Sequence, residues 1–256
     1  MTLTDPIARR PVDMSESEWE TRVAVAACHR LQAHYRLTDL TNGFIAGRIP
    51  DEPDFCVVTR YGHFADEVTA SNLVRMSIHH TDDVLLGVDV VPAAAPLFQT
   101  LFRARPEVNG IVHAHTKATE TLSSLGCRIL PMSHPGLMMH ARTGYVDYAY
   151  EHDEPFCATM VEAFEGNVCL LMHNHGMIAL GRSPREAFYN TFTFDQACLI
   201  QLEAYQSGRQ ILLPDDVDII SAAYAADAAA GVDWDGSREW PGWIRMLDRT
   251  DPSYRD

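Results

Sequence analysis

The sequence predicts an α/β fold, a three-layer domain built around a mixed sheet. Segments with helical periodicity alternate with short apolar segments of strand character along the chain. The length of 256 residues suits one domain, and 46% hydrophobic with 21% charged residues is ordinary for a globular core. We expect a single domain over residues 15–256, preceded by a flexible arm at 1–14 and ending in an irregular tail from about 210 to 256.

The individual elements follow from local signals in chain order. Ser15 and Glu18 form a capping-box pattern, which predicts a helix that continues to about Tyr35. A turn at 50–54 separates two strands, and a short helix or turn at 69–78 leads into another strand. Residues 127–150 are expected to mix loop and short strands. Further helices are predicted at 95–108, 116–125, 154–166 and 183–208, and further strands at 109–115 and 168–176.

Composition argues against several classes of partner. The net charge of -15 and the pI near 5.1 disfavour nucleic acid and anionic membrane surfaces. No apolar run approaches 18 residues and the N-terminus lacks an apolar signal stretch, so a cytoplasmic protein is expected. The six cysteines show no CxxC spacing and are expected to be reduced and mostly buried. Lys117 is the single lysine, so any Schiff-base mechanism would depend on it.

Two histidines one residue apart end an apolar strand and indicate a metal site. In a strand, His113 and His115 point to the same face, where paired imidazoles suit a divalent cation. The best third donor is His175, which also follows an apolar strand. Three imidazoles with an open coordination position are typical of a catalytic rather than a structural metal site.

Longer motifs around these histidines resemble a known family. "RARPEVNGIVHAHT", followed about sixty residues later by "NVCLLMHNHGMIALGRSPREAF", resembles the class II aldolase/adducin superfamily. "YGHFADEVTASNL" and "WPGWIRMLDRTDPSYRD" are similar to its adducin-like metabolic branch. The resemblance implies a three-layer α/β/α class II aldolase-like domain with a mixed, mainly antiparallel sheet. It also implies a homotetramer with active sites near subunit interfaces, and a divalent zinc, manganese or iron ion held by His113, His115 and His175.

The sequence departs from the sugar-phosphate aldolases of this family beside the metal. There, a Ser-Ser-Glu stretch supplies a metal-binding, proton-shuttling glutamate and a phosphate cradle, whereas this chain has Pro92, Ala93 and Ala94. Phe98 replaces a histidine common in the adducin-like branch, and Phe44 replaces a polar residue of an early Gly-rich loop. These apolar replacements predict a substrate without phosphate. A shifted helix register, with Glu107 or Glu151 taking over as the carboxylate, remains the alternative.

The expected activity follows from the groups that remain. Metal-assisted decarboxylation needs no deprotonating base, whereas retro-aldol cleavage does, so loss of the glutamate favours a decarboxylase over an aldolase. We expect a lyase acting on an aromatic or hydrophobic hydroxy or oxo acid, a small-molecule carboxylate. One alternative is an iron oxygenase performing oxidative decarboxylation on the same scaffold. Another is a non-catalytic, adducin-like interaction module.

Secondary candidates surround this site. His173, His140 and Tyr145 are expected catalytic groups that donate protons, and His173 is also a possible fourth ligand. His134 and Arg142 are expected to bind the substrate carboxylate.

Other polar residues nearby have weaker expected roles. Tyr148 is a further candidate proton donor, and Lys117 is expected to point away from the metal or to meet an anionic substrate. His79 and His80 are interpreted as an exposed turn without a metal.

Overall fold

The computed structural model describes residue 11 and residues 14–80, 89–90, 93–230 and 234–256. The expected N-terminal arm lies almost entirely outside the described residues. Seven strands form one sheet in the order β3-β2-β1-β4-β7-β6-β5. Every neighbouring pair is antiparallel except β5 and β6, which run parallel. The predicted mixed, mainly antiparallel sheet is confirmed.

The elements have the following bounds. The strands are β1 Phe44–Ile49, β2 Glu52–Val58, β3 Val74–Ser77, β4 Gly110–Ala114, β5 Thr143–Asp147, β6 Cys169–His173 and β7 Met177–Gly181. The α-helices are α1 Glu16–Tyr35, α2 Ala94–Ala104, α3 Lys117–Ser124, α4 His134–His140, α5 Glu154–Ala163, α6 Pro184–Gln206, α7 Val217–Ala230 and α8 Trp240–Thr250. Two short 3-10 helices lie at η1 Ala70–Asn72 and η2 Pro252–Arg255.

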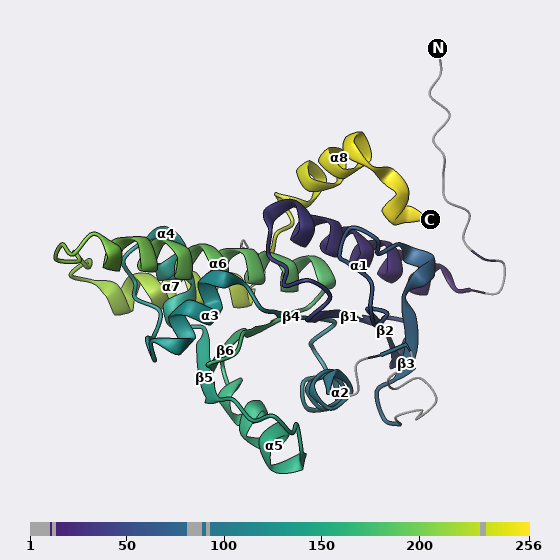
Figure 1. Ribbon diagram of the computed structural model, residues 1–256, viewed down its shortest axis with the longest axis horizontal. Coiled ribbons are helices and arrows are strands. Elements are labelled where there is room, and N and C mark those ends of the chain that lie inside the picture. The colour runs from purple at the N-terminus through teal and green to yellow at the C-terminus, as the bar shows by residue number, and fades with distance from the viewer. Residues whose placement is uncertain (1–10, 12–13, 81–88, 91–92, 231–233) are drawn as a thin grey trace.

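Helices cover both faces of the sheet, as the three-layer prediction requires. Figure 1 shows α1, α6, α3 and α4 on one face and α2 and α5 on the other. Each face has its own buried apolar cluster, one around Leu31, Val112 and Phe188 and one around Phe98, Ile111 and Met160. Successive side chains of a strand point alternately into the two clusters. Residues two positions apart therefore lie on the same face of the sheet.

The helix-start signals are confirmed with one difference. The Ser15 side chain accepts the Glu18 backbone N–H at 3.2 Å, so Ser15 caps α1 as expected. The Glu18 carboxylate does not complete the box, because it accepts hydrogen bonds from Arg22 and Arg75 instead. Glu18 therefore ties α1 to β3 rather than to its own N-terminus.

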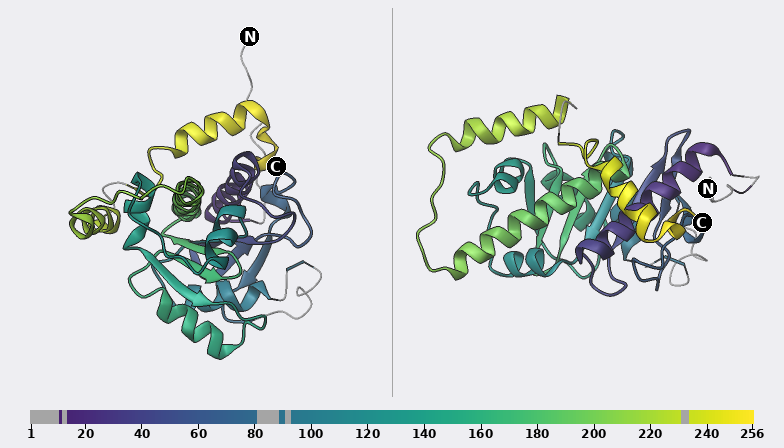
Figure 2. Two further views of the ribbon diagram at one scale, coloured as in Figure 1. Left: turned by 60° about the vertical axis from the view of Figure 1, so that its left-hand side comes forward. Right: turned by 90° about the horizontal axis from the view of Figure 1, so that it is seen from above.

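The tail expected to be irregular is largely helical. Residues 217–230 form α7 and residues 240–250 form α8, which lies across the outer side of α1 in Figure 2. The buried Trp243 of α8 donates its indole N–H to the Tyr35 hydroxyl at 3.0 Å. The expectation of an irregular tail was wrong because α7 is rich in alanine, the residue of highest helix propensity. None of the helices in the described ranges is both long and apolar enough to span a membrane.

The register of two strand pairs, β4–β7 and β5–β6, defines two ends of the sheet. In the β4–β7 pair, His113 faces Ile178 and Gly110 faces Gly181. In the β5–β6 pair, Asp147 faces His173 and Thr143 faces Cys169. The strand ends that carry His113 and His173 lie on one side of the sheet, which we call the histidine end. The strand ends that carry Gly110 and Gly181 form the opposite end.

Candidate metal centre

Three histidine side chains converge at the histidine end of the sheet. The Nε2 atom of His115 lies 2.9 Å from Nε2 of His113 and 3.1 Å from Nε2 of His175. Nitrogen ligands of a tetrahedral zinc site are separated by about 3.3 Å, as ligand distances near 2.0–2.1 Å require. The three imidazoles are therefore spaced as a metal-ligand set. Among the described residues, these three side chains form a group whose potential ligand atoms all lie within 4.8 Å of one another.

The turn between β6 and β7 brings His175 to the other two histidines. Asn174 adopts the left-handed conformation, with φ of 58°, and the His175 backbone N–H donates to the Met172 carbonyl at 3.1 Å. Gly176 has no room for a side chain, because a Cβ there would lie 2.3 Å from the Ala114 carbonyl oxygen and 2.5 Å from the His115 ring. The glycine thus lets the turn approach the end of β4 closely enough for His175 to join the cluster.

Contacts around the cluster orient the rings. His113 Nδ1 donates to the Met177 carbonyl at 2.9 Å, which leaves Nε2 with its lone pair free for a cation. His115 Nδ1 lies 3.9 Å from a carboxylate oxygen of Asp39, behind the cluster. Tyr148 stacks on His175, with ring centroids 4.3 Å apart and planes at 15°. The rings of His113 and His175 are thus held by neighbours outside the cluster, and the three Nε2 atoms lie close to one another.

Burial keeps these imidazoles neutral. Desolvation lowers the pKa of His113 well below its ordinary value, and neighbouring His115 and His175 lower it further. The pKa of His115 is also lowered by desolvation, and that of His175 falls to about 4. Neutral imidazole is the form that binds a metal, so the cluster is ready for a divalent cation at neutral pH.

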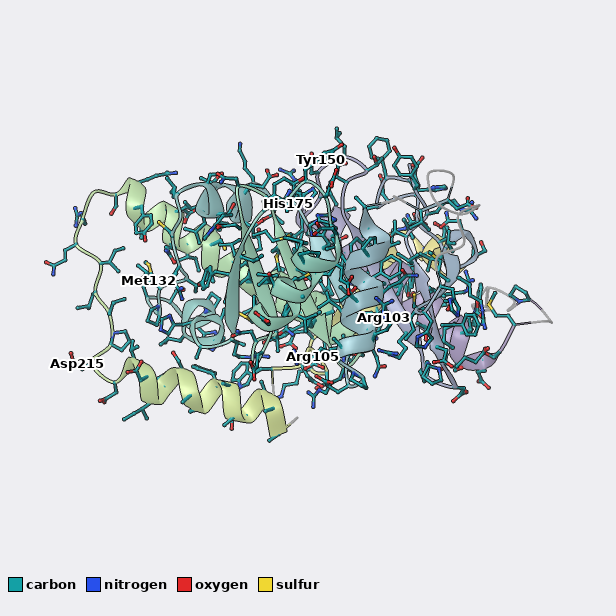
Figure 3. All side chains as sticks on the ribbon, turned by 90° about the horizontal axis from the view of Figure 1, so that it is seen from below. Arg103, Arg105, Met132, Tyr150, His175 and Asp215 are labelled. Carbon is teal, nitrogen blue, oxygen red and sulfur yellow. The ribbon has the colours of Figure 1, made fainter. Side chains whose placement is uncertain are left out.

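A pocket of about 260 Å³ opens beside the three histidines. Figure 3 shows two of its residues, His175 and Tyr150, at the same edge of the molecule. The lining residues are Asn42, Gly43, Phe44, Ala93, Ala94, Leu97, His113, His115, Tyr148, Tyr150, His152 and His175. Among the residues that the structure describes, this lining contains no carboxylate, lysine or arginine. It is an aromatic and apolar pocket with histidines on one side.

The residues expected to make this pocket apolar take two positions. Phe44 and Ala94 line it directly, and the Phe44 ring lies 5.5 Å from the His113 ring. Phe98 is fully buried behind Phe44, with ring centroids 5.5 Å apart, and does not line the pocket. Phe98 therefore supports the pocket wall rather than touching its contents.

Neither alternative carboxylate reaches this pocket. Glu107 lies at the opposite end of the sheet, where Arg105 donates to it at 2.5 Å. Glu151 is exposed and is not among the lining residues. Ala94 is the first residue of α2 and lines the pocket. The space beside the histidines is bordered by a methyl group.

Three expected site residues belong to the other layer of the fold. The Tyr145 hydroxyl accepts the Ile129 N–H at 2.9 Å, and burial raises the pKa of Tyr145 to about 12. His140 donates to the Ile129 carbonyl at 2.9 Å. His134 packs its ring against Tyr224 and Trp234. None of the three lines the pocket, because α4 and the Tyr145 side chain lie on the α6 face of the sheet.

Two further expected residues are also directed elsewhere. His173 sits at the histidine end, but its Nδ1 pairs with Asp147 at 2.7 Å and it does not line the pocket. Arg142 immediately precedes β5, so it lies at the opposite end of the sheet and lines a different pocket. Lys117 is exposed at the start of α3 and is absent from the lining, and His79 is exposed and paired with Asp54.

Sequence reasoning missed His152, which lies in the loop before α5. Its Nδ1 donates to the Ala93 carbonyl at 2.7 Å, and its Nε2 is buried without a hydrogen-bond partner among the described residues. It lies close enough for its charge to act on His113 and His175. The local sequence "EHDEP" carries no strand or metal-ligand pattern, so only the long-range contact with Ala93 reveals its position.

Comparison with known proteins places these features in a family. Residues 23–202 match the family described as class II aldolase and adducin N-terminal domain. A protein of Pseudomonas aeruginosa assigned to aldolase class 2 is 30% identical over 251 residues, covering 94% of each chain. Rat beta-adducin is 29% identical over 263 residues, which cover 95% of this chain and 36% of the adducin.

Solved structures agree with this assignment. An aldolase II superfamily protein from Pseudomonas syringae superposes with a TM-score of 0.86 at 29% identity, covering 95% of this chain and 98% of the other. L-fuculose 1-phosphate aldolase from Glaciozyma antarctica shares the fold, with a TM-score of 0.78 at 19% identity over 96% of this chain and 97% of its own. The chain belongs to the class II aldolase and adducin family.

Proposed function

We propose that the chain is a divalent-metal-dependent carbon–carbon lyase, a decarboxylase of a small, non-phosphorylated aromatic or hydrophobic hydroxy or oxo acid. The observation that carries this proposal is the pocket beside His113, His115 and His175, whose described lining lacks any carboxylate, lysine or arginine. Zinc, manganese and iron all accept three imidazole ligands with further positions open.

The pocket lining favours a substrate without phosphate. A phosphate dianion needs several donors or cations, and burying one without them costs several kcal/mol. Beyond the histidine cluster, this pocket offers mainly aromatic and apolar surface from Phe44, Leu97 and Tyr150. Such surfaces bind a flat, apolar substrate body through ring contacts and burial. The substrate class therefore differs from the sugar phosphate named for the Glaciozyma relative.

Decarboxylation suits the groups present better than retro-aldol cleavage. A bound divalent cation would supply a Lewis acid that stabilises negative charge on the substrate oxygens. When the bond to the carboxyl carbon breaks, CO2 leaves and the electron pair moves onto the oxygen of a conjugated carbonyl, as an enolate or phenolate, so no base is required. Retro-aldol cleavage would require a base to take the hydroxyl proton. Ala94 supplies none, and His152, whose Nε2 has no partner among the described residues, acts as an acid in this proposal.

His152 is the proton donor in this proposal. Its hydrogen bond to the Ala93 carbonyl fixes the ring, and Nε2 is the remaining polar atom. A protonated Nε2 would deliver its proton to the carbon that has lost CO2, and solvent would restore it. His152 thereby takes the catalytic role expected for His173, His140 and Tyr145, which face elsewhere. Tyr148, stacked on His175, would hold the ligand ring and exclude water.

The experiment is an assay of the full chain loaded with manganese, zinc or iron, run with and without O2. Aromatic and aliphatic 3-oxo acids and hydroxyaryl carboxylic acids are tested beside L-fuculose 1-phosphate, with CO2 from the acids and aldehyde from the phosphorylated sugar as the two readouts. Release of CO2 from an apolar acid without O2 supports the proposal. Turnover that requires O2 would establish the oxygenase alternative, and preferred cleavage of the phosphorylated sugar would contradict the substrate class. Failure to bind any divalent metal would favour the non-catalytic alternative.

A further inference from the structure

A second pocket lies at the opposite end of the same strands. It has a volume of about 300 Å³ and contacts Gly181 at the end of β7, whereas the metal centre adjoins the start of that strand. Figure 3 shows Arg105 of this pocket at the edge of the molecule opposite His175 and Tyr150. The pocket is separate from the metal centre, and none of the described residues lines both.

Arg142 is buried in this pocket with an unused donor. The residue is 4% exposed, and its Nη1 atom is buried without a hydrogen-bond partner in the described part of the chain. Burial lowers the pKa of Arg142, but a guanidinium remains charged at neutral pH. Burying a charged group with an unpaired hydrogen-bond donor costs free energy. A bound acceptor that carries negative charge would offset that cost.

The other buried arginines among the described residues show how this fold normally satisfies such a group. Arg22 pairs with Glu18 at 2.8 Å and also donates to two backbone carbonyls. Arg48 donates from its three nitrogens to the carbonyls of Val108, Pro53 and Phe102. Arg142 differs from both, since its Nη1 finds neither a carboxylate nor a carbonyl among the described residues.

The charges around Arg142 leave one positive charge in excess. Two other arginines line the pocket, and each is paired: Arg105 with Glu107 at 2.5 Å and Arg182 with Glu186 at 2.9 Å. The charge of Glu186 also acts on Arg142, but its oxygens accept from the backbone and guanidinium of Arg182. Asp235 lies outside the lining and pairs with Arg185. The lining as a whole therefore calls for a single negative charge.

Apart from Asn167 and two glycines, the remaining walls of the pocket are apolar. They are formed by side chains from α7, β7 and the loops before β4 and β6, namely Val108, Val168, Leu180, Ala225, Ala228 and Ala229. The alanines of α7 leave open space where larger side chains would fill it. A ligand that fits would combine one anionic group with an apolar body.

We propose that this pocket is a second ligand site, which binds a small organic monocarboxylate with its carboxylate on Arg142 and its apolar body against α7. A carboxylate provides the acceptor that Nη1 lacks and balances the excess charge of the lining. A phosphate dianion would over-compensate that charge and would meet the apolar wall with its remaining oxygens. The proposal does not depend on the reaction at the metal centre.

The test uses the full metal-loaded chain and 4-bromobenzoate as the probe. Crystals soaked with the probe are expected to show a bromine anomalous signal in this pocket, with the carboxylate at Arg142. In solution, R142M is expected to weaken binding at this site by about tenfold or more, as loss of a charge-assisted hydrogen bond implies. R103M removes the same charge from outside the pocket lining and is expected to leave the affinity unchanged.

Two more measurements separate the role of the carboxylate from that of the apolar body. A225F fills the pocket with Arg142 intact and is expected to abolish the bromine signal there, whether or not R142M folds. The neutral 4-bromobenzamide is expected to bind at least about tenfold more weakly than the acid. A signal at the metal centre alone would overturn the proposal, and so would equal affinity of R142M and the unchanged protein. Preferential binding of inorganic phosphate at Arg142 would overturn the carboxylate assignment.

Discussion

The two ends of strands β4 and β7 differ in the charge of the side chains that are buried there. At the histidine end, desolvation lowers the pKa values of His113, His115 and His175, so the cluster is neutral and offers lone pairs. At the opposite end, Arg142 is also buried but cannot lose its charge at neutral pH. The histidine cluster can therefore accept a cation, whereas Arg142, whose Nη1 lacks an acceptor among the described residues, would be stabilised by an anion. The same sheet thus has a candidate cation site at one end and a proposed anion site at the other.

Loss of one metal ligand is the largest effect expected at either end. H115A removes the ligand that lies between the other two, and we expect metal affinity to fall more than about 100-fold, with loss of all metal-dependent turnover. H173A is the matched control, because His173 is a nearby histidine paired with Asp147 outside the cluster. Elemental analysis of both purified variants makes the comparison. Equal metal content in the two variants would contradict the ligand assignment.

Loss of the proposed proton donor is expected to have the next largest effect. H152Q should lower kcat by about 100-fold or more, the usual contribution of general acid catalysis, while metal content stays normal. H140Q is the control, since His140 bonds to Ile129 in the other layer. Steady-state rates and metal analysis of both variants are compared. A normal kcat in H152Q would exclude His152 as the donor.

Stability measurements should distinguish a buried arginine with hydrogen-bond acceptors from one that lacks an acceptor. R48M leaves three backbone carbonyls without their donor and is expected to lower the free energy of unfolding by about 3 kcal/mol. R142M removes a buried charge with an unsatisfied donor and is expected to leave stability unchanged or to raise it in ligand-free protein. Urea unfolding of both variants gives the two values. A large loss in R142M would show that Arg142 has a structural partner.

The pH dependence of stability should arise from histidines whose pKa is lowered by burial, namely the cluster at the histidine end and His29 of α1. The folded-state pKa of His113 lies below its unfolded value near 6.5, so the unfolded chain binds more protons in acid. Stability of the metal-free protein is therefore complete above pH 6.5 and falls below it, by up to about 1.4 kcal/mol per pH unit for each such histidine. Urea unfolding at pH 7.5 and 5.5 measures this loss, and H113N should reduce it. An unchanged slope in H113N would contradict the burial argument.

The sequence predicted the parts of the site that depend on local pattern. Strand parity placed His113 and His115 on one face, and the end of a second apolar strand indicated His175 as the third donor. The resemblance added the alanine at 94. The fold class followed from the same alternation of elements and from the family. The helical tail also has a local signal, the alanine-rich composition of α7, so a prediction weighted by helix propensity would have found it.

The remaining site features depend on contacts between distant segments. His152 reaches the pocket through a hydrogen bond to Ala93, fifty-nine residues earlier in the chain. Tyr145 is turned away from it by strand parity and bonded to Ile129. Arg142 was expected to bind the substrate, but the direction of β5 places it at the opposite end of the sheet. Such partners are fixed by tertiary packing, which short motifs do not encode.

The most direct test of the metal centre is an anomalous diffraction map of metal-loaded crystals, recorded at the absorption edge of the bound metal. The three-histidine site predicts one peak about 2.0–2.3 Å from the Nε2 atoms of His113, His115 and His175, with no carboxylate oxygen in the coordination sphere. A peak elsewhere in the molecule, or a metal coordinated by an aspartate or glutamate beside Ala94, would contradict this account.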